Sequence, residues 1–301
     1  MRIGLTGATG FLGQAFVKRA IADGHTVIAW RRDSHAQPDR VSDGVTWIDG
    51  RLGDQDAATE LAQRSDVIVH AGLDRSSDGF MDWPADPTAY FQTNVIGTLQ
   101  LIEAAVSHSL RRFVFVSSGA VHEKIAINRS LDETHPLWPG SIYGSYKASV
   151  ETLIHAYGNS GRLSCCAVRP TAIYGAADPI ADSKWFALVQ DIVAGRSVDV
   201  SGGSKSVNVD DVVDAIRMLL ETDDCIDGES YNCCDRMISE HEVATIAKRL
   251  SKSESVISGS EKVAKNVIDT TKIQGLGFTF GGTPKLEATI QTLIDAGKSG
   301  H

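Results

Sequence analysis

The chain has 301 residues, of which 42% are hydrophobic and 22% charged, a composition that excludes a disordered or collagen-like protein. Its 29 lysines and arginines stand against 38 aspartates and glutamates, which gives a formal net charge of −9. An acidic chain lacks the general attraction to phosphate backbones and anionic lipids that a basic chain has, so neither nucleic acid nor a membrane surface is an expected partner.

Five cysteines lie at positions 165, 166, 225, 233 and 234, an odd number with two adjacent pairs. This spacing fits neither a CxxC metal site nor a disulfide framework, so we expect reduced thiols and no metal. The apolar start Met1–Leu5 is too short for a signal peptide, and no later run reaches the roughly 18 apolar residues of a membrane span. A cytoplasmic protein is expected.

Apolar runs of strand length alternate with helix-period segments through the first half, a pattern typical of βαβ units and a parallel sheet. The expected strands are Arg2–Leu5, Thr26–Trp30, Val45–Ile48, Asp66–His70, Arg112–Ser117 and Ser164–Arg169. The expected helices of this half are Phe11–Asp23, Pro87–Ser107 and Ser141–Asn159.

Beyond Arg169 the elements become shorter and are separated by loops with Pro, Gly and Asp. Helices are expected near Lys184–Ala194, Asp210–Glu221, Ser239–Leu250 and Lys285–Ala296. The predicted fold class is α/β: a doubly wound parallel sheet of the Rossmann type over residues 1–170, and a smaller C-terminal α/β lobe over residues 171–301 that binds the substrate. The boundary is soft, and elements of the two parts can interleave.

A glycine-rich turn, Thr6-Gly7-Ala8-Thr9-Gly10-Phe11-Leu12-Gly13, follows the first strand and opens the first helix. Small residues let the backbone turn sharply, and the free N–H groups of the helix start can hold a pyrophosphate. Strand, turn, helix and second strand follow in this order, so the segment predicts dinucleotide binding.

The second expected strand ends in Trp30-Arg31-Arg32, where an NAD site normally supplies Asp or Glu for the ribose hydroxyls. Two guanidinium groups would instead attract a 2′-phosphate. We therefore favour NADP(H) over NAD(H). The alternative is that Arg31 and Arg32 are only the solvated start of a loop.

Tyr143 and Lys147 are four residues apart and lie on one face of an expected helix. A tyrosine has a pKa of about 10 and is a poor base at neutral pH unless nearby cations stabilise its phenolate. The Lys147 ammonium and an oxidised nicotinamide ring are expected to lower the pKa of Tyr143. Ser118 follows the fifth strand at its carboxyl end, where open α/β sheets bind ligands, and its hydroxyl can hold a reacting oxygen.

Together these motifs resemble the extended short-chain dehydrogenase/reductases of the NAD-dependent epimerase/dehydratase type. The resemblance covers nearly the whole chain. It also rests on six further segments: Asp66–Gly72, Asn94–Thr98, Val116–Ser118, Arg169–Gly175, Asn208–Val212 and Asp269–Phe278.

The resemblance implies a role for individual residues. Tyr143 is the acid/base, Lys147 its partner and a ribose ligand, and Ser118 the donor to the substrate oxygen. The implied cofactor-binding set is Gly7, Gly10, Phe11, Leu12, Gly13, Arg31, Arg32, Leu52, Ala71, Gly72, Asn94, Tyr143, Lys147, Pro170 and Ile173. The implied substrate set is Leu73, Ser118, Ala120, His122 and Trp185. Asn94 equally suits a buried brace, and Trp185 equally suits loop packing.

Departures from the family narrow the expected reaction. Gly119-Ala120 stands where dehydratases carry acidic residues, and Ala172, Ser204 and Asn208 replace residues that nucleotide-sugar epimerases use as anchors. Arg51 replaces an adenine-contacting Asp, although Asp49 can shift into its place and Asp54 can cap the next helix. The sequence therefore predicts an NADP(H)-linked reduction in which Tyr143 protonates the oxygen of a small-molecule carbonyl.

Two other functions stay open. One is a sugar or nucleotide-sugar epimerase with tightly bound NAD, and the other is an NADP(H)-sensing regulator, which the Tyr143 and Lys147 pair disfavours. The apolar faces of Pro87–Ser107 and Ser141–Asn159 suit either a homodimer contact or the intramolecular core.

Overall fold

The computed structural model describes residues 1–32, 44–75 and 81–298. By its internal contacts the chain forms two units, and each is described by itself. Unit 1 comprises Met1–Pro170, Val213–Cys233 and Asp269–Phe278, so the chain returns to it twice. Unit 2 comprises Thr171–Val212, Cys234–Ile268 and Thr279–His301.

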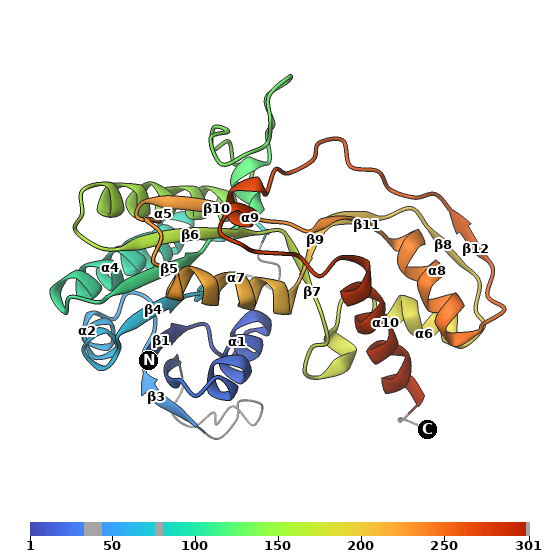
Figure 1. Ribbon diagram of the computed structural model, residues 1–301, viewed down its shortest axis with the longest axis horizontal. Helices are drawn as coiled ribbons and strands as arrows, with labels where there is room; N and C mark the ends of the chain where they lie inside the picture. Colours follow the sequence, from blue (N-terminus) through green and yellow to red (C-terminus); the bar gives the residue numbers. More distant parts are fainter. Residues whose placement is uncertain (33–43, 76–80, 299–301) are drawn as a thin grey trace. The chain divides into compact units, whose positions relative to one another are not determined.

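Unit 1 is built on a seven-stranded parallel sheet with the strand order β10-β6-β5-β4-β1-β2-β3 (Figure 1). Its strands are β1 (Arg2–Thr6), β2 (Thr26–Arg31), β3 (Val45–Asp49), β4 (Val67–His70), β5 (Arg112–Val116), β6 (Cys165–Pro170) and β10 (Glu229–Cys233). The strand order reverses beside β1, which places the ligand crevice of such a sheet at the carboxyl ends of β1 and β4. This sheet confirms the predicted fold class, and β10 adds an edge strand that the sequence analysis did not assign.

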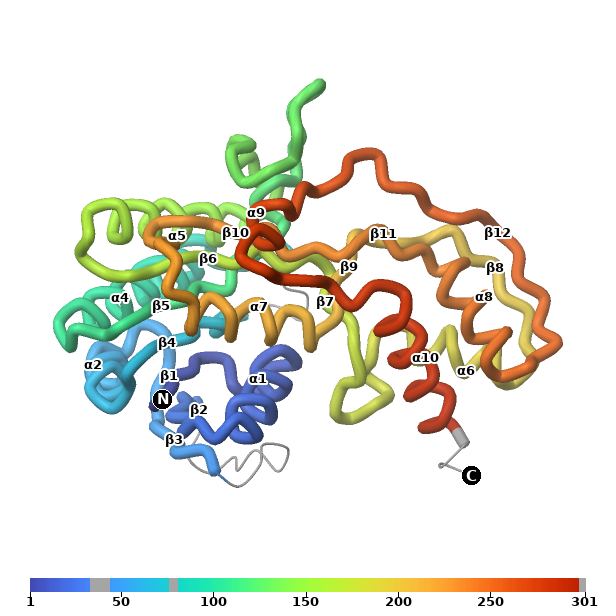
Figure 2. Tube along the Cα trace, in the orientation of Figure 1, coloured from blue at the N-terminus to red at the C-terminus, as the bar shows by residue number. Residues whose placement is uncertain are grey.

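Helices cover both faces of this sheet. They are α1 (Phe11–Ala22), α2 (Gln55–Arg64), α3 (Pro87–Phe91), the π-helical turn η1 (Gln92–Ile96), α4 (Gly97–Ser107), the 3-10 turn η2 (Gly119–His122), α5 (Ile142–Asn159), α7 (Val209–Glu221) and α9 (Thr271–Gly275). Figures 1 and 2 show α4 and α5 on one side of the sheet and α1 and α7 on the other. The core between the sheet and α2, α4 and α5 is apolar, with Leu61, Leu101, Phe113, Phe115 and Ile154 fully buried.

Unit 2 holds two small sheets and three helices that pack on one another. The elements are β7 (Ala172–Tyr174), η3 (Ile180–Asp182), α6 (Phe186–Val193), β8 (Val198–Val200), β9 (Gly203–Asn208), β11 (Arg236–Ser239), α8 (Glu240–Ser251), β12 (Ile257–Gly259) and α10 (Gly282–Lys298). One sheet has the order β11-β9-β7, and the other pairs β12 with β8. Apolar residues of α6, α8 and α10 form its core.

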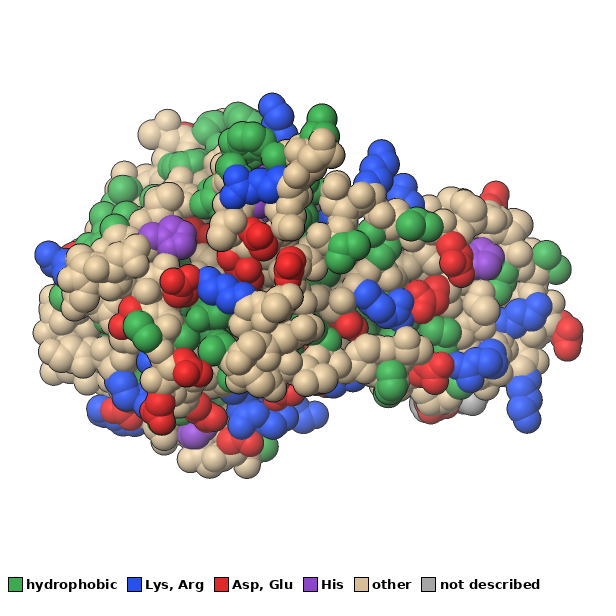
Figure 3. All heavy atoms as spheres, turned by 45° about the horizontal axis from the view of Figure 1, so that its top comes forward, with side chains coloured by type: hydrophobic (Ala, Val, Ile, Leu, Met, Phe, Trp, Pro, Cys, Tyr) green, Lys and Arg blue, Asp and Glu red, His purple; other side chains and the backbone are tan. Residues whose placement is uncertain are grey.

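The surface carries charges of both signs. On the face shown in Figure 3, acidic and basic side chains lie interspersed. Within residues 1–32, 44–75 and 81–298, none of the helices has the length and apolarity that crossing a bilayer would require. In the same part of the chain, His, Cys, Asp and Glu side chains form no group that could hold a metal ion.

Candidate functional site

The turn between β1 and α1 needs its glycines for steric reasons. Gly7 has a φ of +80°, and a Cβ there would lie 2.7 Å from the carbonyl oxygen of Ala71. A Cβ on Gly13 would lie 2.0 Å from the carbonyl oxygen of Gly7, closer than real atoms approach. Gly10 is the N-cap of α1 and has no side chain that could accept from the first N–H groups of the helix. The turn therefore presents bare backbone donors, which fit the pyrophosphate of a dinucleotide.

A buried chain of hydrogen bonds holds this turn against the loop after β4. The N–H of Gly72 donates to the Thr6 hydroxyl at 2.9 Å, and that hydroxyl lies 2.6 Å from Nδ1 of His70. Nε2 of His70 lies 2.8 Å from the Thr98 hydroxyl, which donates to the carbonyl of Asn94. Burial lowers the pKa of His70 to about 3, so the ring is neutral and connects the turn, β4 and α4 without a charge.

A groove with a volume of 400 Å³ lies at the carboxyl ends of β1, β2 and β4. It brings together many of the residues assigned to the cofactor. These are Gly7, Gly10, Arg31, Arg32, Leu52, Ala71 and Gly72. Leu73, assigned to the substrate, lines the same groove, as do Thr6, Thr9, Trp30 and Arg75, which the sequence analysis did not single out.

The other assigned residues do not line this groove within the described part of the chain. Phe11 and Leu12 begin α1, and Gly13 is buried beneath the turn. Pro170 ends β6 in unit 1, and Ile173 lies in β7 of unit 2.

Both arginines at the end of β2 have carboxylate partners that the sequence analysis did not foresee. Nε of Arg31 lies 2.8 Å from Asp49, and Nη1 of Arg32 lies 3.4 Å from Asp74. Asp49 ends β3 and Asp74 follows β4, so parallel pairing brings carboxylates to the arginines from strands that are neighbours only in space. Arg51 and Arg75 also line the groove. These six side chains carry four positive and two negative charges.

Asn94 acts as a brace. It is fully buried in η1, where its amide donates to the carbonyls of Asp74 and Tyr90 and accepts from the N–H of Asp74, all within 3.0 Å. These bonds fix the backbone of the residue that pairs with Arg32. The structure thus bears out the brace, and direct contact of Asn94 with a cofactor stays a prediction.

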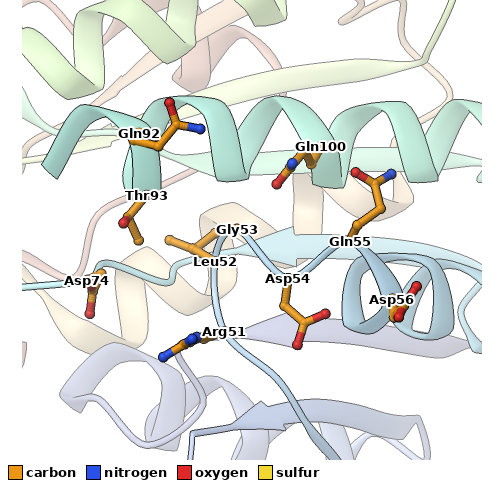
Figure 4. A pocket seen from close by; sticks show the side chains of 10 residues that line it. All are labelled: Arg51, Leu52, Gly53, Asp54, Gln55, Asp56, Asp74, Gln92, Thr93 and Gln100. Atoms are coloured by element: carbon orange, nitrogen blue, oxygen red, sulfur yellow. The ribbon is translucent and has the colours of Figure 1, made fainter. Parts of the chain in front are cut away.

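A second cavity of 680 Å³ adjoins the groove and shares Arg51, Leu52, Asp74 and Thr93 with it (Figure 4). Gln92, Thr93 and Gln100 reach it from the α3–α4 segment, and residues 51–54 reach it from the turn after β3 (Figure 4). Asp54 caps α2, as expected, by accepting from the N–H of Ala57 at 3.0 Å.

Ser118, Tyr143 and Lys147 come together at the carboxyl end of β5. Ser141 caps α5 by accepting from the N–H of Gly144 at 3.0 Å, and this helix start places Tyr143 in the first turn. The Ser118 side chain is hydrogen-bonded to Tyr143 and also accepts from the N–H of Ala120 at 3.2 Å. Lys147 lies one turn further, with its Nζ 5.7 Å from the centre of the Tyr143 ring.

The expected lowering of the Tyr143 pKa by Lys147 does not occur in the structure. Burial raises the pKa of Tyr143, and only the bond to Ser118 and the charge of Arg75 oppose this. The ammonium of Lys147 donates to the carbonyl of Val116 at 2.7 Å, and burial lowers its own pKa to about 7. Tyr143 therefore holds its proton in the structure, so the part of the expectation that rests on Lys147 is wrong, while the effect of an oxidised nicotinamide ring stays a prediction.

His122, expected to line the substrate pocket, is buried and bonded on both ring nitrogens. Nε2 lies 3.0 Å from Nη1 of Arg169, and Nδ1 lies 3.3 Å from the carbonyl of Pro136. Burial and the charge of Arg169 lower the pKa of His122 to about 4, so the ring is neutral. Its contacts are thus with the interior, while Ala120 is half-buried in the same turn.

Trp185 packs inside unit 2. The ring centre of Trp185 lies 5.3 Å from that of Tyr174, and Nζ of Lys184 lies 4.6 Å from the centre of the Trp185 ring. Trp185 belongs to the apolar layer around the core of unit 2, which bears out loop packing. A contact with substrate stays a prediction.

Comparison with known proteins agrees with this architecture. The model of the NAD dependent epimerase/dehydratase family matches residues 3–234. The chain belongs to this family. Membership confirms the resemblance stated from the motifs and the prediction of an NAD(P)-dependent enzyme.

Three similar proteins illustrate the range of the family. The chain is 32% identical to UDP-glucose 4-epimerase of Mycolicibacterium smegmatis, over 71% of this chain and 72% of that protein. It is 31% identical to 2-alkyl-3-oxoalkanoate reductase of Stenotrophomonas maltophilia, over 59% of this chain and 52% of the relative. The crystal structure of Thermus thermophilus UDP-glucose 4-epimerase in complex with NAD has a TM-score of 0.78 at 22% identity and covers all of both chains, which supports the fold.

Proposed function

We propose that this protein is an oxidoreductase that reduces a carbonyl group of a small molecule, with NADP(H) as its preferred cofactor. The observation that carries the reaction is Tyr143, a half-buried phenol that keeps its proton and is hydrogen-bonded to Ser118. A carbonyl that accepts a hydride needs a proton on its oxygen, and a phenol that holds its proton until then suits a general acid. When bound, the dinucleotide supplies the hydride.

The chain's own residues provide binding and proton transfer. Ser118 donates to the substrate oxygen, and Tyr143 gives that oxygen its proton as negative charge develops there. The Lys147 ammonium is held by the carbonyl of Val116 one helical turn from Tyr143, and the bond to Ser118 and the charge of Arg75 favour the phenolate that remains.

The preference for NADP(H) is supported by the charges around the groove. The six side chains carry four guanidinium groups and two carboxylates, which leaves a surplus of two positive charges for a 2′-phosphate. When a phosphate approaches Arg31 or Arg32, a phosphate oxygen replaces the carboxylate oxygen as partner of the guanidinium group. The guanidinium groups therefore stay paired throughout.

A second candidate is an epimerase that keeps its dinucleotide bound. The 32% identity to a UDP-glucose 4-epimerase favours it. An epimerase would return the hydride to its substrate, so it would consume no added NADPH.

Titration of the purified protein with NADPH and with NADH tests the proposal, because Trp30 lines the groove and its fluorescence reports occupancy. A panel of carbonyl compounds, followed by nicotinamide absorbance, then identifies a substrate. We expect tighter binding of NADPH and its consumption by at least one carbonyl compound. Tightly retained NAD together with no NADPH consumption would support the epimerase instead.

A further inference from the structure

One face of α5 carries three functional groups at intervals of four residues. Tyr143, Lys147 and Glu151 follow one another along this face, toward the end of β5. The sequence analysis considered the first two and passed over Glu151. A carboxylate in the middle of an amphipathic helix normally faces solvent, yet Glu151 is fully buried.

Two consecutive residues at the end of β5 form hydrogen bonds to side chains from two successive turns of α5. The carbonyl of Val116 accepts from Nζ of Lys147 at 2.7 Å. The hydroxyl of Ser117, the next residue, donates to Oε1 of Glu151. Ser118 comes directly after. The backbone that carries Ser118 is therefore fastened to α5 at the two positions that precede it.

Glu151 is itself fixed from two other strands. Arg169 on β6 donates to both carboxylate oxygens, with Nη2 at 2.6 Å from Oε2 and Nε at 3.0 Å from each oxygen. Ser230 on β10 donates to Oε2 at 3.1 Å. Arg169 also reaches His122 in the turn after Ser118. The carboxylate of Glu151 thus joins β5, β6, β10 and α5 at one buried point.

Resting on the acid–base role proposed for Tyr143 and Ser118, we propose that Glu151 is a positioning residue of this site. Its carboxylate fixes the strand end that carries Ser118 and supplies the counter-charge to the buried Lys147 ammonium. Arg169 completes the arrangement, because it orients the carboxylate by donating to both of its oxygens.

The charged and titratable groups around Lys147 are few. On α5 itself they are Tyr143, Tyr146 and Glu151, and β4 contributes His70, which is neutral because burial lowers its pKa to about 3. The ring of Phe115 on β5 lies 4.7 Å from Nζ. Burial lowers the pKa of Lys147 to about 7, and Glu151 opposes this.

Around Glu151 itself, Arg169 on β6 is the ion-pair partner, and the neutral His122 lies behind it. The serine hydroxyls from β5 and β10 complete its contacts. Removal of the negative charge of Glu151 should therefore favour the uncharged form of Lys147.

Two serines offer a matched test of the positioning role. Ser117 and Ser230 are equally buried, and each gives one hydrogen bond to Glu151, but only Ser117 leads directly to Ser118. With the carbonyl compound that the wild type reduces fastest, Ser117→Ala should lower kcat about tenfold with an unchanged Kd for NADPH. Ser230→Ala should keep kcat within about twofold. An equal loss of kcat in both variants would show that Glu151 has a purely structural role and would overturn the proposal.

The charge of Glu151 is tested without any substrate. Nuclear magnetic resonance titration of isotope-labelled lysine, assigned with Lys147→Met, gives the midpoint of Lys147 in the free protein. In Glu151→Gln this midpoint should fall by about one pH unit, whereas Glu151→Asp, which keeps the charge, should stay near the wild type. An unchanged midpoint in a folded Glu151→Gln protein would contradict the proposal.

The two tests separate this inference from the proposed function. Glu151→Gln leaves Arg169 without its counter-charge and can fail to fold; the serine pair then decides. If no carbonyl compound consumes NADPH, the proposed function fails, and the lysine titration still decides whether Glu151 holds the charge of Lys147.

Discussion

Unit 1 contains two kinds of arginine–carboxylate pair, and they differ in what surrounds them. Arg169 and Glu151 have side chains 1% and 0% exposed, and five hydrogen bonds from Ser117, Ser230 and Arg169 reach the carboxylate within 3.1 Å. Arg32 and Asp74 are 70% and 48% exposed and lie 3.4 Å apart. A buried pair cannot lose one partner without leaving a charge in the interior, so it fixes geometry. An exposed pair contributes little stability and can exchange its partner.

This difference assigns separate tasks to the two regions. Under the proposed function, the buried Glu151 and Lys147 of α5 hold the acid–base residues in one arrangement, and the exposed arginines of the groove bind the anionic phosphate of the cofactor.

The largest effect is expected on the buried face. Tyr143→Phe removes the proton donor and keeps the ring, so kcat should fall about 1000-fold while NADPH still binds with the Kd of the wild type. Single-turnover kinetics and fluorescence titration measure the two quantities. A variant that retained most of its activity would remove Tyr143 from the reaction.

His122, which contacts the buried Arg169, should also make the free energy of unfolding depend on pH. His122 has a pKa lowered to about 4 in the folded state from an ordinary value of 6.5, so the unfolded chain binds more protons between these values. The free energy of unfolding should therefore be highest above pH 6.5 and fall as the pH is lowered toward 4, with a contribution of His122 on the order of 3 kcal/mol.

Urea unfolding at pH 6.5 and pH 4 of the wild type and of His122→Gln measures this contribution, since glutamine keeps hydrogen-bonding groups and does not titrate in this range. Carboxylates titrate in both proteins and cancel in the difference. A variant with the full pH dependence of the wild type would show that His122 is accessible to protons in the folded state.

The smallest effects are expected on cofactor affinity, at Arg31 and its partner Asp49 beside the groove. Arg31→Ala should weaken NADPH about tenfold and leave NADH unchanged, because it removes a charged hydrogen bond to the 2′-phosphate. Asp49→Asn should strengthen NADPH a few-fold, since it frees Arg31. Arg64→Ala, which breaks an exposed pair with Glu60 on α2, is the control and should change neither. Equal losses for both cofactors in Arg31→Ala would contradict the NADP(H) preference.

Local patterns predicted much of unit 1. The glycine turn, the six strands and the helix with Tyr143 and Lys147 follow from periodicity and capping, which act over short stretches of chain. The π-helical turn at Gln92–Ile96 could not be predicted, because residue preferences do not distinguish it from the α-helix around it.

The charge partners were beyond the sequence analysis. Asp49 reaches Arg31 across a strand pair, and Arg169 reaches Glu151 from a neighbouring strand, so both contacts depend on the completed sheet. One signal was present for Glu151, its place four residues after Lys147 on the same helix face. The raised pKa of Tyr143 likewise depends on burial, which only the packed structure shows.

Isotope tracing tests the central claim most directly. The wild-type protein is supplied with NADPH carrying deuterium at C4 of the nicotinamide and with its preferred carbonyl compound, and the alcohol is analysed by mass spectrometry. The account predicts that the deuterium appears on the former carbonyl carbon and that Tyr143→Phe forms almost no labelled alcohol. Product formed without deuterium from either face of C4, or labelling unaffected by Tyr143→Phe, would contradict it.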